Sequence, residues 1–216
     1  MKLIKLISML VLLIFMVGQA NATNLILNGS FESGTDPGKT HITLYQGSND
    51  IDYWTVTVGS IDYIGGTWQA SDGYRSIDLS GYYQAGEIEV SQPFNTVVDQ
   101  QYLVTFDMAG NPDNGEKIKN LSVTVAGQSY DFTFDATGKT RTNMGWLTKS
   151  FVFMATDIST SLKFTSMMDA KDAWGPALDN VSVTIIPEPG TFLLLGVGIA
   201  GFFGYSWRRR KLTIKN

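Results

Sequence analysis

Apolar residues recur at every second position through most of the chain between residues 23 and 186. In "QYLVTFDM" the residues Tyr102, Val104, Phe106 and Met108 share one face of a strand. The stretches "EIEVSQPF", "KSFVFMA", "SLKFTS" and "DNVSVTII" repeat this pattern. A period of two is typical of β-strands with one buried face, whereas an amphipathic helix has a period of 3.6. No stretch of this region has a convincing helical period, so we expect an all-β domain.

Turn residues divide the region into about ten short strands. In "LSVTVAGQSYDFTFD" two alternating runs flank a Gly-containing turn, which predicts a hairpin around Ala126-Gly127-Gln128. Many short strands separated by Gly, Asn and Asp predict an antiparallel β-sandwich or jelly roll. Residues 23–186 are long enough for one such domain.

The first 22 residues have the features of an export signal. Lys2 and Lys5 precede an apolar run over residues 6–17, and Ala20-Asn21-Ala22 supplies small residues for cleavage. This arrangement predicts a signal peptide over residues 1–22, helical before its removal, with a mature start near Thr23. A permanent N-terminal anchor is the alternative, although the apolar run is short for a membrane span.

Residues 187–216 have three parts in a fixed order. Pro187-Glu188-Pro189 comes first, and an uncharged apolar run over residues 191–207 follows. Arg208, Arg209, Arg210 and Lys211 come next. The apolar run predicts a transmembrane helix that begins after Pro189, because proline disfavours helix in the residue before it. The basic tail should remain in the cytoplasm.

Together, "PEPG", the apolar run and the Arg cluster resemble the PEP-CTERM sorting signal of Gram-negative bacteria. The resemblance implies a protein that is held transiently in the inner membrane. An exosortase-type protease then cuts it near Pro-Glu-Pro, and it reaches the cell surface or the extracellular matrix. An ordinary single-pass anchor is the alternative reading of the same residues.

The charge balance and the lack of cysteine exclude several classes of function. Residues 23–186 contain nine Lys or Arg and nineteen Asp or Glu, which gives a net charge of about −10. This charge disfavours nucleic acid and anionic membranes as partners and is compatible with divalent cations. The chain has no cysteine, so disulfides, thiol chemistry and zinc-thiolate sites are excluded.

Stretches at both ends and in the middle of residues 24–184 carry a second resemblance. They are "NLILNGSFESG", "WTVTVGSIDYIGGTWQASDGYRSIDLSG", "VTFDMAGNPD", "DATGKTRTNMGWLTKSFVF" and "GPALDNVSV". Together they resemble the choice-of-anchor C family, whose domain is similar to the DUF642 domains of plant cell walls. The resemblance implies a galactose-binding-like jelly roll. It does not imply a defined activity.

In a jelly roll the first and last strands lie side by side, so Glu32 and Asp179 can converge. With backbone oxygens of the turn at Asn28, they would form the oxygen cage that calcium requires. Similar carbohydrate-binding jelly rolls hold a structural calcium at this corner, so we expect one calcium ion as a cofactor. Alternatively, Glu32 and Asp179 accept hydrogen bonds from loop N–H groups.

Aromatic residues in Gly-, Ser- or Asp-rich stretches suggest a surface that recognises sugars. Exposed rings stack on the apolar faces of sugars, and neighbouring polar groups bind the hydroxyls. The candidate residues for carbohydrate binding are Trp68, Gln69, Asp72, Tyr74, Arg75, Tyr82, Tyr83 and Trp174. Alternatively, these rings pin long loops against the sandwich. The alternation predicts that Trp54 lies in the core and leaves the position of Trp146 open.

The sequence offers no recognisable catalytic motif. His41 is the single histidine, and neither a cysteine nor a Gly-x-Ser-x-Gly motif is present. A carboxylate pair for glycoside hydrolysis remains open, because acidic residues are plentiful. We therefore expect an exported, non-catalytic protein whose partner is exopolysaccharide or another glycan. The alternative is a structural or adhesive domain that binds protein.

Overall fold

The computed structural model describes residues 23–169, 171–187, 196 and 198–202. Thr23–Ile185 form one unit, and Met1–Ala22 with Ile186–Asn216 form the other. The predicted signal peptide lies outside the described residues, as do most of the predicted transmembrane helix and the whole basic tail. Residues 196 and 198–202 are helical. Within the described part of the chain, no helix combines the length and the hydropathy that crossing a bilayer requires.

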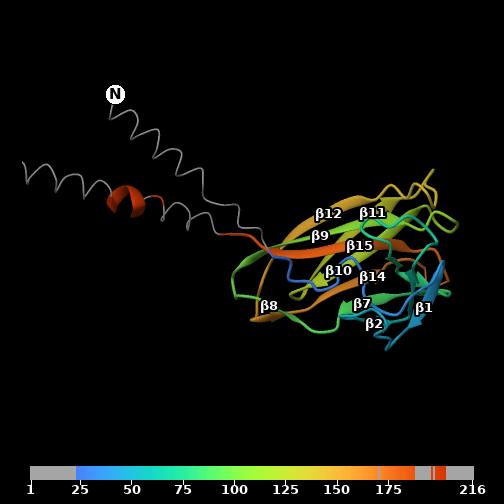
Figure 1. The fold of residues 1–216 in the computed structure, drawn as a ribbon, viewed down its shortest axis with the longest axis horizontal. Helices are drawn as coiled ribbons and strands as arrows, with labels where there is room; N and C mark the ends of the chain where they lie inside the picture. The colour runs from blue at the N-terminus through green and yellow to red at the C-terminus, as the bar shows by residue number, and fades with distance from the viewer. Residues whose placement is uncertain (1–22, 170, 188–195, 197, 203–216) are drawn as a thin grey trace, which may run out of the picture. The chain divides into compact units, whose positions relative to one another are not determined.

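The unit Thr23–Ile185 is built from two antiparallel sheets whose strands run along its long axis (Figure 1). The six-stranded sheet has the order β1 (His41–Tyr45), β3 (Ser60–Ile64), β4 (Ser76–Asp78), β15 (Pro176–Ile185), β9 (Gln101–Gly110) and β12 (Leu147–Met154). The five-stranded sheet has the order β11 (Gln128–Asp135), β10 (Ile118–Val125), β14 (Leu162–Ser166), β7 (Glu87–Val90) and β2 (Trp54–Val58). Two short pairs join β13 (Ser159–Thr160) to β8 (Phe94–Asn95) and β5 (Ser80–Gly81) to β6 (Gln84–Ala85). The all-β antiparallel prediction is confirmed.

The alternating apolar residues form the core between the sheets. Tyr102, Val104, Phe106 and Met108 are all buried, as their shared face on β9 predicts. Trp54 is also buried and lies in the core cluster, where its ring contacts those of Phe31 and Phe164. The prediction of a core Trp54 is therefore confirmed. Trp146, whose position the sequence left open, is half-buried and packs against the core.

The predicted hairpin joins β10 to β11. Residues Val125 and Gln128 are paired, so Ala126 and Gly127 form a two-residue turn. Both turn residues have positive φ angles, 48° and 72°. Two positive φ angles are the signature of the type I′ turn, whose twist matches that of the strands it connects. The hairpin prediction is confirmed.

The N-terminal segment lies beside the last strand without being a regular strand itself. The backbone N–H of Leu25 donates to Val183 O at 2.8 Å, and the N–H of Val181 donates to Gly29 O at 2.8 Å. The Asn24 side chain bridges the two segments, accepting from Val183 N and donating to Val181 O. The start and the end of the domain are therefore neighbours, as the jelly-roll expectation requires.

The register of β9 and β15 defines two ends of the sandwich. Pro176 is paired with Gly110 at one end, and Ile185 is paired with Tyr102 at the other. The first end carries the loops 111–117 and 171–175, and we call it the site end. The second end carries the segments 91–100 and 155–161 with Ile185, and we call it the exit end because the chain leaves the domain there. In Figure 1, β8 lies at the exit end.

Candidate functional site

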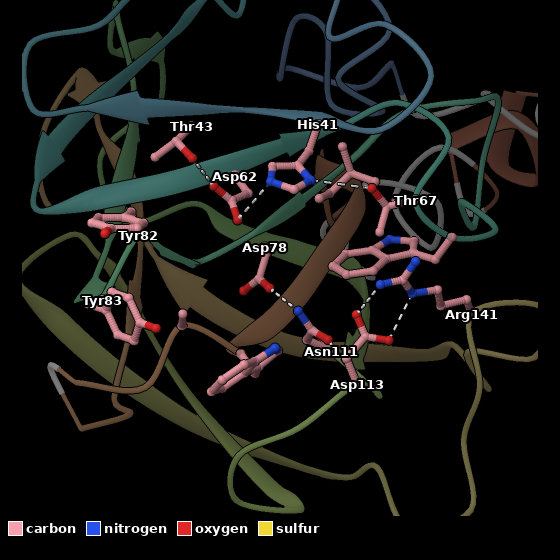
Figure 2. A pocket seen from close by; sticks show the side chains of 14 residues that line it. His41, Thr43, Asp62, Thr67, Asp78, Tyr82, Tyr83, Asn111, Asp113 and Arg141 are labelled. Atoms are coloured by element: carbon pink, nitrogen blue, oxygen red, sulfur yellow. Dashed lines mark hydrogen bonds and ion pairs between the residues drawn. The ribbon is translucent and has the colours of Figure 1, made fainter.

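A cavity of about 330 Å³ opens on the outward face of the six-stranded sheet, next to the site end (Figure 2). Its floor comes from three adjacent strands. Thr43 of β1 is paired with Asp62 of β3, and Asp62 is paired with Asp78 of β4. Paired residues in adjacent strands share a face of the sheet, so these polar side chains form one row across the floor. His41 lies two residues before Thr43 and faces the same side.

Asp62 is the floor carboxylate that is partly open to solvent. Its Oδ1 accepts a hydrogen bond from Thr43 Oγ1 at 2.6 Å, and its Oδ2 lies 3.8 Å from His41 Nε2. Burial raises the pKa of Asp62, while the hydrogen bond from Thr43 and the charge on His41 act in the opposite direction. Asp62 therefore keeps hydrogen-bonding capacity that faces the cavity.

Asp78 is fully buried beneath the cavity and ties three segments together. Its Oδ1 accepts hydrogen bonds from Ser80 N and Gly175 N, both at 2.9 Å. Its Oδ2 accepts a hydrogen bond from Asn111 Nδ2 at 2.8 Å. Desolvation is the main cause that raises the pKa of Asp78 to about 8. One buried acid therefore fixes the segment after β4, the loop before β15 and the loop after β9.

Lys119 of β10 fixes the same loops from the other side. Lys119 is fully buried. Its Nζ donates one hydrogen bond to Trp174 O and another, at 3.4 Å, to Asn114 O. Desolvation is the main cause that lowers the pKa of this ammonium group. The two carbonyls come from the loops 171–175 and 111–117, so Lys119 joins the loops that form the site end.

Aromatic and charged side chains stand on opposite sides of the cavity (Figure 2). Tyr82 and Tyr83 are 65% and 55% exposed, and their rings meet edge-on with centroids 4.9 Å apart. Across the cavity, Arg141 Nε and Nη2 donate to the two carboxylate oxygens of Asp113 at 2.8 and 2.6 Å. Trp174, which is half-buried, also lines the cavity. The cavity therefore offers ring faces and polar groups together.

The family of the chain is decided by the match over the whole sandwich. The DUF642 family, described as a protein of unknown function, matches residues 24–184. The chain belongs to the DUF642 family. A second match covers residues 186–211 and is the PEP-CTERM protein-sorting motif. This motif implies an exported protein that is anchored in a membrane before processing. Both resemblances in the sequence are thereby confirmed.

A curated relative is similar to this chain over most of the chain's length. Halomucin of Haloquadratum walsbyi is 30% identical over 173 residues, which is 79% of this chain. The chain spans only 2% of Halomucin. The likeness therefore concerns a small part of that protein.

Solved structures share the jelly-roll architecture at low sequence identity. The arabinose-bound α-L-arabinofuranosidase MgGH51 has a TM-score of 0.52 at 13% identity, over 78% of this chain and 27% of the enzyme. The xylan-binding domain CBM22-1 of Paenibacillus barcinonensis Xyn10C has a TM-score of 0.48 at 16% identity, over 77% and 97% of the two chains. TmCBM61 in complex with β-1,4-galactotriose has a TM-score of 0.46 at 15% identity, over 76% and 100%.

The cavity of the DUF642 domain brings together four of the eight residues predicted to bind sugar: Trp68, Tyr82, Tyr83 and Trp174. The expectation that all of these rings are exposed is wrong for Trp68, which is only 6% exposed. Its loop folds back over the outward face of the sheet, where Trp68 Nε1 donates to Ser76 Oγ at 2.9 Å. Trp68 therefore pins its loop and forms a wall of the cavity.

The other four predicted residues, Gln69, Asp72, Tyr74 and Arg75, do not line this cavity. Tyr74 and Arg75 line a separate hollow with Glu32, and Tyr74 is 84% exposed there. The backbone O of Gln69 accepts a hydrogen bond from Trp146 Nε1 at 2.9 Å. A contribution of these four residues to sugar binding stays a prediction.

Glu32 and Asp179, the predicted calcium ligands, both cap the same loop. Glu32 Oε1 accepts hydrogen bonds from Tyr74 N and Arg75 N at 2.8 and 2.7 Å. Asp179 Oδ2 accepts hydrogen bonds from the backbone N–H groups of residues 71 and 72. Desolvation is the main cause that raises the pKa of Asp179 to about 7. These contacts correspond to the loop-capping alternative that the sequence left open.

Asn28, the third predicted ligand, also serves its own loop. Its Nδ2 donates to Ser33 O and Asp52 O, and its Oδ1 accepts from Ser33 N. Across the described residues, no group of three or more His, Asp or Glu side chains is arranged to hold a metal ion. Calcium binding stays a prediction. A melting curve with and without chelator tests it, because a ligand that binds only the folded state raises its stability.

Several residues of the cavity were missed by the sequence reasoning. His41, Asn111 and Asp113 line the cavity, although no motif in the sequence marks them as binding residues. The other polar residues of the cavity that the sequence did not indicate include Thr43, Asp62, Asp78 and Arg141. One signal was available in the strands, where His41, Thr43 and Asp62 occupy outward-facing positions that alternate with apolar residues in "HITLY" and "SIDYI". Arg141 and Asn111 come from loops, where no such period exists.

Proposed function

We propose that the DUF642 domain binds a glycan, such as an exopolysaccharide, in the cavity between Tyr82-Tyr83 and Asp113-Arg141. One observation carries the proposal: a concave site of about 330 Å³ has exposed aromatic rings on one side and hydrogen-bonding groups on the other. Sites of this size that combine ring faces with a few fixed polar groups are typical of small-molecule recognition.

The chemistry of the cavity suits a pyranose or furanose ring. The edge-on pair Tyr82-Tyr83 offers a ring face for stacking on the C–H face of a sugar. On the opposite side, Asp113 and Arg141 hold each other in a two-bond pair and keep further lone pairs and N–H groups for hydroxyls. Asp62 supplies an acceptor on the floor.

A glycan array probed with the purified protein, with and without calcium, tests the proposal. Tyr82→Ala and Tyr83→Ala should each weaken binding to a recognised glycan by about fivefold or more, because removing a stacked ring costs about 1–3 kcal/mol. Tyr74→Ala is the matched control, since Tyr74 is an exposed tyrosine outside the cavity. If Tyr74→Ala abolishes binding and the other two variants do not, the site is the Glu32 hollow instead.

The delivery route is the second part of the proposal. The sorting motif at residues 186–211 supports processing by an exosortase-type protease and display at the cell surface or in the matrix. Cleavage near Pro187–Pro189 would remove the apolar run and the Arg cluster. Mass spectrometry of protein recovered from the cell surface or the medium tests this. A C-terminus at intact Asn216 would contradict cleavage.

Glycan hydrolysis is a second candidate, because Asp62 and Asp78 are directly paired on the cavity floor. Retaining glycosidases use two carboxyl groups about 5–5.5 Å apart. However, Asp78 is fully buried and both of its oxygens accept hydrogen bonds from the protein, which suits a positioning role better. Release of oligosaccharides that Asp62→Asn abolishes would establish hydrolysis.

A domain that binds protein rather than sugar is the remaining alternative. The same glycan array separates it from the proposal, since binding to no glycan on a broad array would favour the adhesive role. The exposed rings of Tyr82 and Tyr83 would then be the first residues to test against a protein partner.

A further inference from the structure

Five exposed aliphatic side chains gather at the exit end of the DUF642 domain. Ile158 and Val97 are 71% and 62% exposed, and the other three are between 41% and 46% exposed. We call this set the exit-end patch: Val97, Val98, Met154, Ile158 and Ile185. Single exposed aliphatic residues are ordinary, but a group of them at one end indicates an interaction surface.

The strand register fixes these residues at one end. Ile185 is paired with Tyr102, and Met154 is paired with Gln101, at the first residues of β9. The backbone N–H of Val97 donates to Tyr102 Oη at 3.0 Å, which holds the loop before β9 against the same strand. The backbone N–H of Thr96 donates to Ile158 O at 2.9 Å, so the Ile158 loop lies beside the Val97 loop.

Buried hydroxyl groups hold the two loops that carry Val97, Val98 and Ile158. Thr96 Oγ1 donates to Asp157 O at 2.7 Å and lies 2.9 Å from Thr160 Oγ1, and both threonines are buried. Asp157 Oδ1 accepts from the N–H of Ile158 at 2.6 Å. The most exposed residue of the patch therefore stands on a hydrogen-bonded turn and projects from a fixed position.

The length of chain after the patch limits what can lie against it. Only residues 186–190 separate Ile185 from the apolar run of the sorting motif. Five residues span at most about 17 Å when fully extended. The PEP-CTERM motif implies a membrane anchor before processing, so the exit end is then held close to the bilayer. At such a short tether length even a weak contact forms readily, because the local concentration of lipid is high.

We propose that the exit-end patch docks on the lipid bilayer while the tail is anchored, with Ile158 and Val97 inserted at the interface. The segments 91–100 and 154–162 contain no Lys or Arg and carry Asp99 and Asp157. These two segments therefore offer no attraction to anionic lipid, and the contact is made by apolar side chains with uncharged or zwitterionic lipid.

Site-specific labelling of the full chain tests the proposal, because the protein has no natural cysteine. The full chain is reconstituted into phosphatidylcholine vesicles, with a polarity-sensitive fluorophore on Ile158→Cys or, as the matched control, on Thr137→Cys. Thr137 is exposed in the turn after β11, at the opposite end from the patch. Vesicles that contain nitroxide-labelled lipid then report contact with lipid directly.

The label at position 158 should shift to the blue, and nitroxide lipid should quench it at least twofold more than the label at position 137. Val97→Asp combined with Val98→Asp in the Ile158→Cys protein should reduce this difference to the control level. Equal quenching at both positions would overturn the proposal, and so would protein that does not float with the vesicles. A blue shift without quenching that disappears when the protein is diluted in lipid would show contact between copies, and would also overturn it.

Discussion

The site end and the exit end of this sandwich are built from the same strands but bury different groups in their loops. At the site end, Asp78 and Lys119 lie buried and each joins two loops through hydrogen bonds. At the exit end, the buried groups that join the loops described above are the hydroxyls of Thr96 and Thr160. Buried ionisable groups hold loops in one arrangement at a high desolvation cost, whereas the desolvation cost of buried hydroxyls is lower. The difference indicates that the site end must keep a defined shape for its cavity.

The largest expected effect is on the pH dependence of stability. The pKa of Asp78 is raised to about 8 and that of Asp179 to about 7, both chiefly by desolvation, above the unfolded value of 3.8. The folded protein therefore holds protons that the unfolded chain releases. This contribution to stability is complete below pH 4 and is lost as the pH rises through 7 and 8.

Urea unfolding between pH 5 and 8 measures this effect. The free energy of unfolding should fall with rising pH, by up to about 1.4 kcal/mol per pH unit for each group. Asp78→Asn keeps the shape of the acid and does not titrate in this range. It should therefore remove the part of the pH dependence of stability that comes from Asp78. A free energy that stays constant over this range would show that the two carboxyls ionise normally.

The second effect is the loss of the buried acid itself. Asp78→Ala leaves the N–H groups of Ser80 and Gly175 and the amide of Asn111 without their buried acceptor. We expect the free energy of unfolding to fall by about 3–5 kcal/mol. Asp113→Ala at the same end should cost less than about 1 kcal/mol, because its partner Arg141 is exposed. Equal costs would mean that Asp78 does not organise the site end.

The third effect separates binding from stability. Lys119→Met keeps the apolar stem of Lys119 but removes its hydrogen bonds to Asn114 O and Trp174 O. We expect glycan affinity to fall about tenfold as the Trp174 loop loosens, while the free energy of unfolding changes by less than about 2 kcal/mol. Lys163→Met, which removes an ion pair with Glu87 on the five-stranded sheet, is the control and should leave affinity unchanged. Unchanged glycan affinity in Lys119→Met would show that Lys119 does not contribute to the shape of the binding site.

The smallest effect is expected at the exit end. Ile158→Ala should change the free energy of unfolding by less than about 0.5 kcal/mol, because the side chain is mostly in solvent. Ile77→Ala, which truncates a core residue of β4, should cost about 2–5 kcal/mol in the same denaturation experiment. A large cost at Ile158 would show that the patch belongs to the core and is not available to a membrane.

The fold was predictable from local patterns, and the site was predictable only in part. The alternation on β9 and the Ala126-Gly127 turn each involve residues that are close together in the sequence. Both could therefore be recognised without knowledge of the tertiary contacts. Tyr82 and Tyr83 were found because a loop of small and polar residues leaves aromatic rings in solvent. Trp68 looked the same in sequence, but its loop folds back onto the sheet.

The positions of the missed cavity residues depend on which strands are neighbours in the sheet. Asp62 and Asp78 lie on one floor because β3 and β4 are paired in one register, and a shift by one residue would separate them. Arg141 reaches the cavity from the loop between β11 and β12, and its ion pair with Asp113 joins segments 28 residues apart. Such long-range contacts follow from the tertiary structure and cannot be inferred from the period of a strand.

The long strand β15 connects the two ends and has a mechanical consequence. It begins directly after Trp174 and Gly175 at the cavity and ends at Ile185, where the tail leaves. A glycan that pulls at the cavity while the tail is anchored would apply force along this strand. The hydrogen bonds that link β15 to β9 and to the segment after Asn24 would then share the load in shear. Strands that are loaded in shear must break their hydrogen bonds together rather than one after another. The strand that connects the membrane tail to the glycan cavity should therefore resist extension strongly.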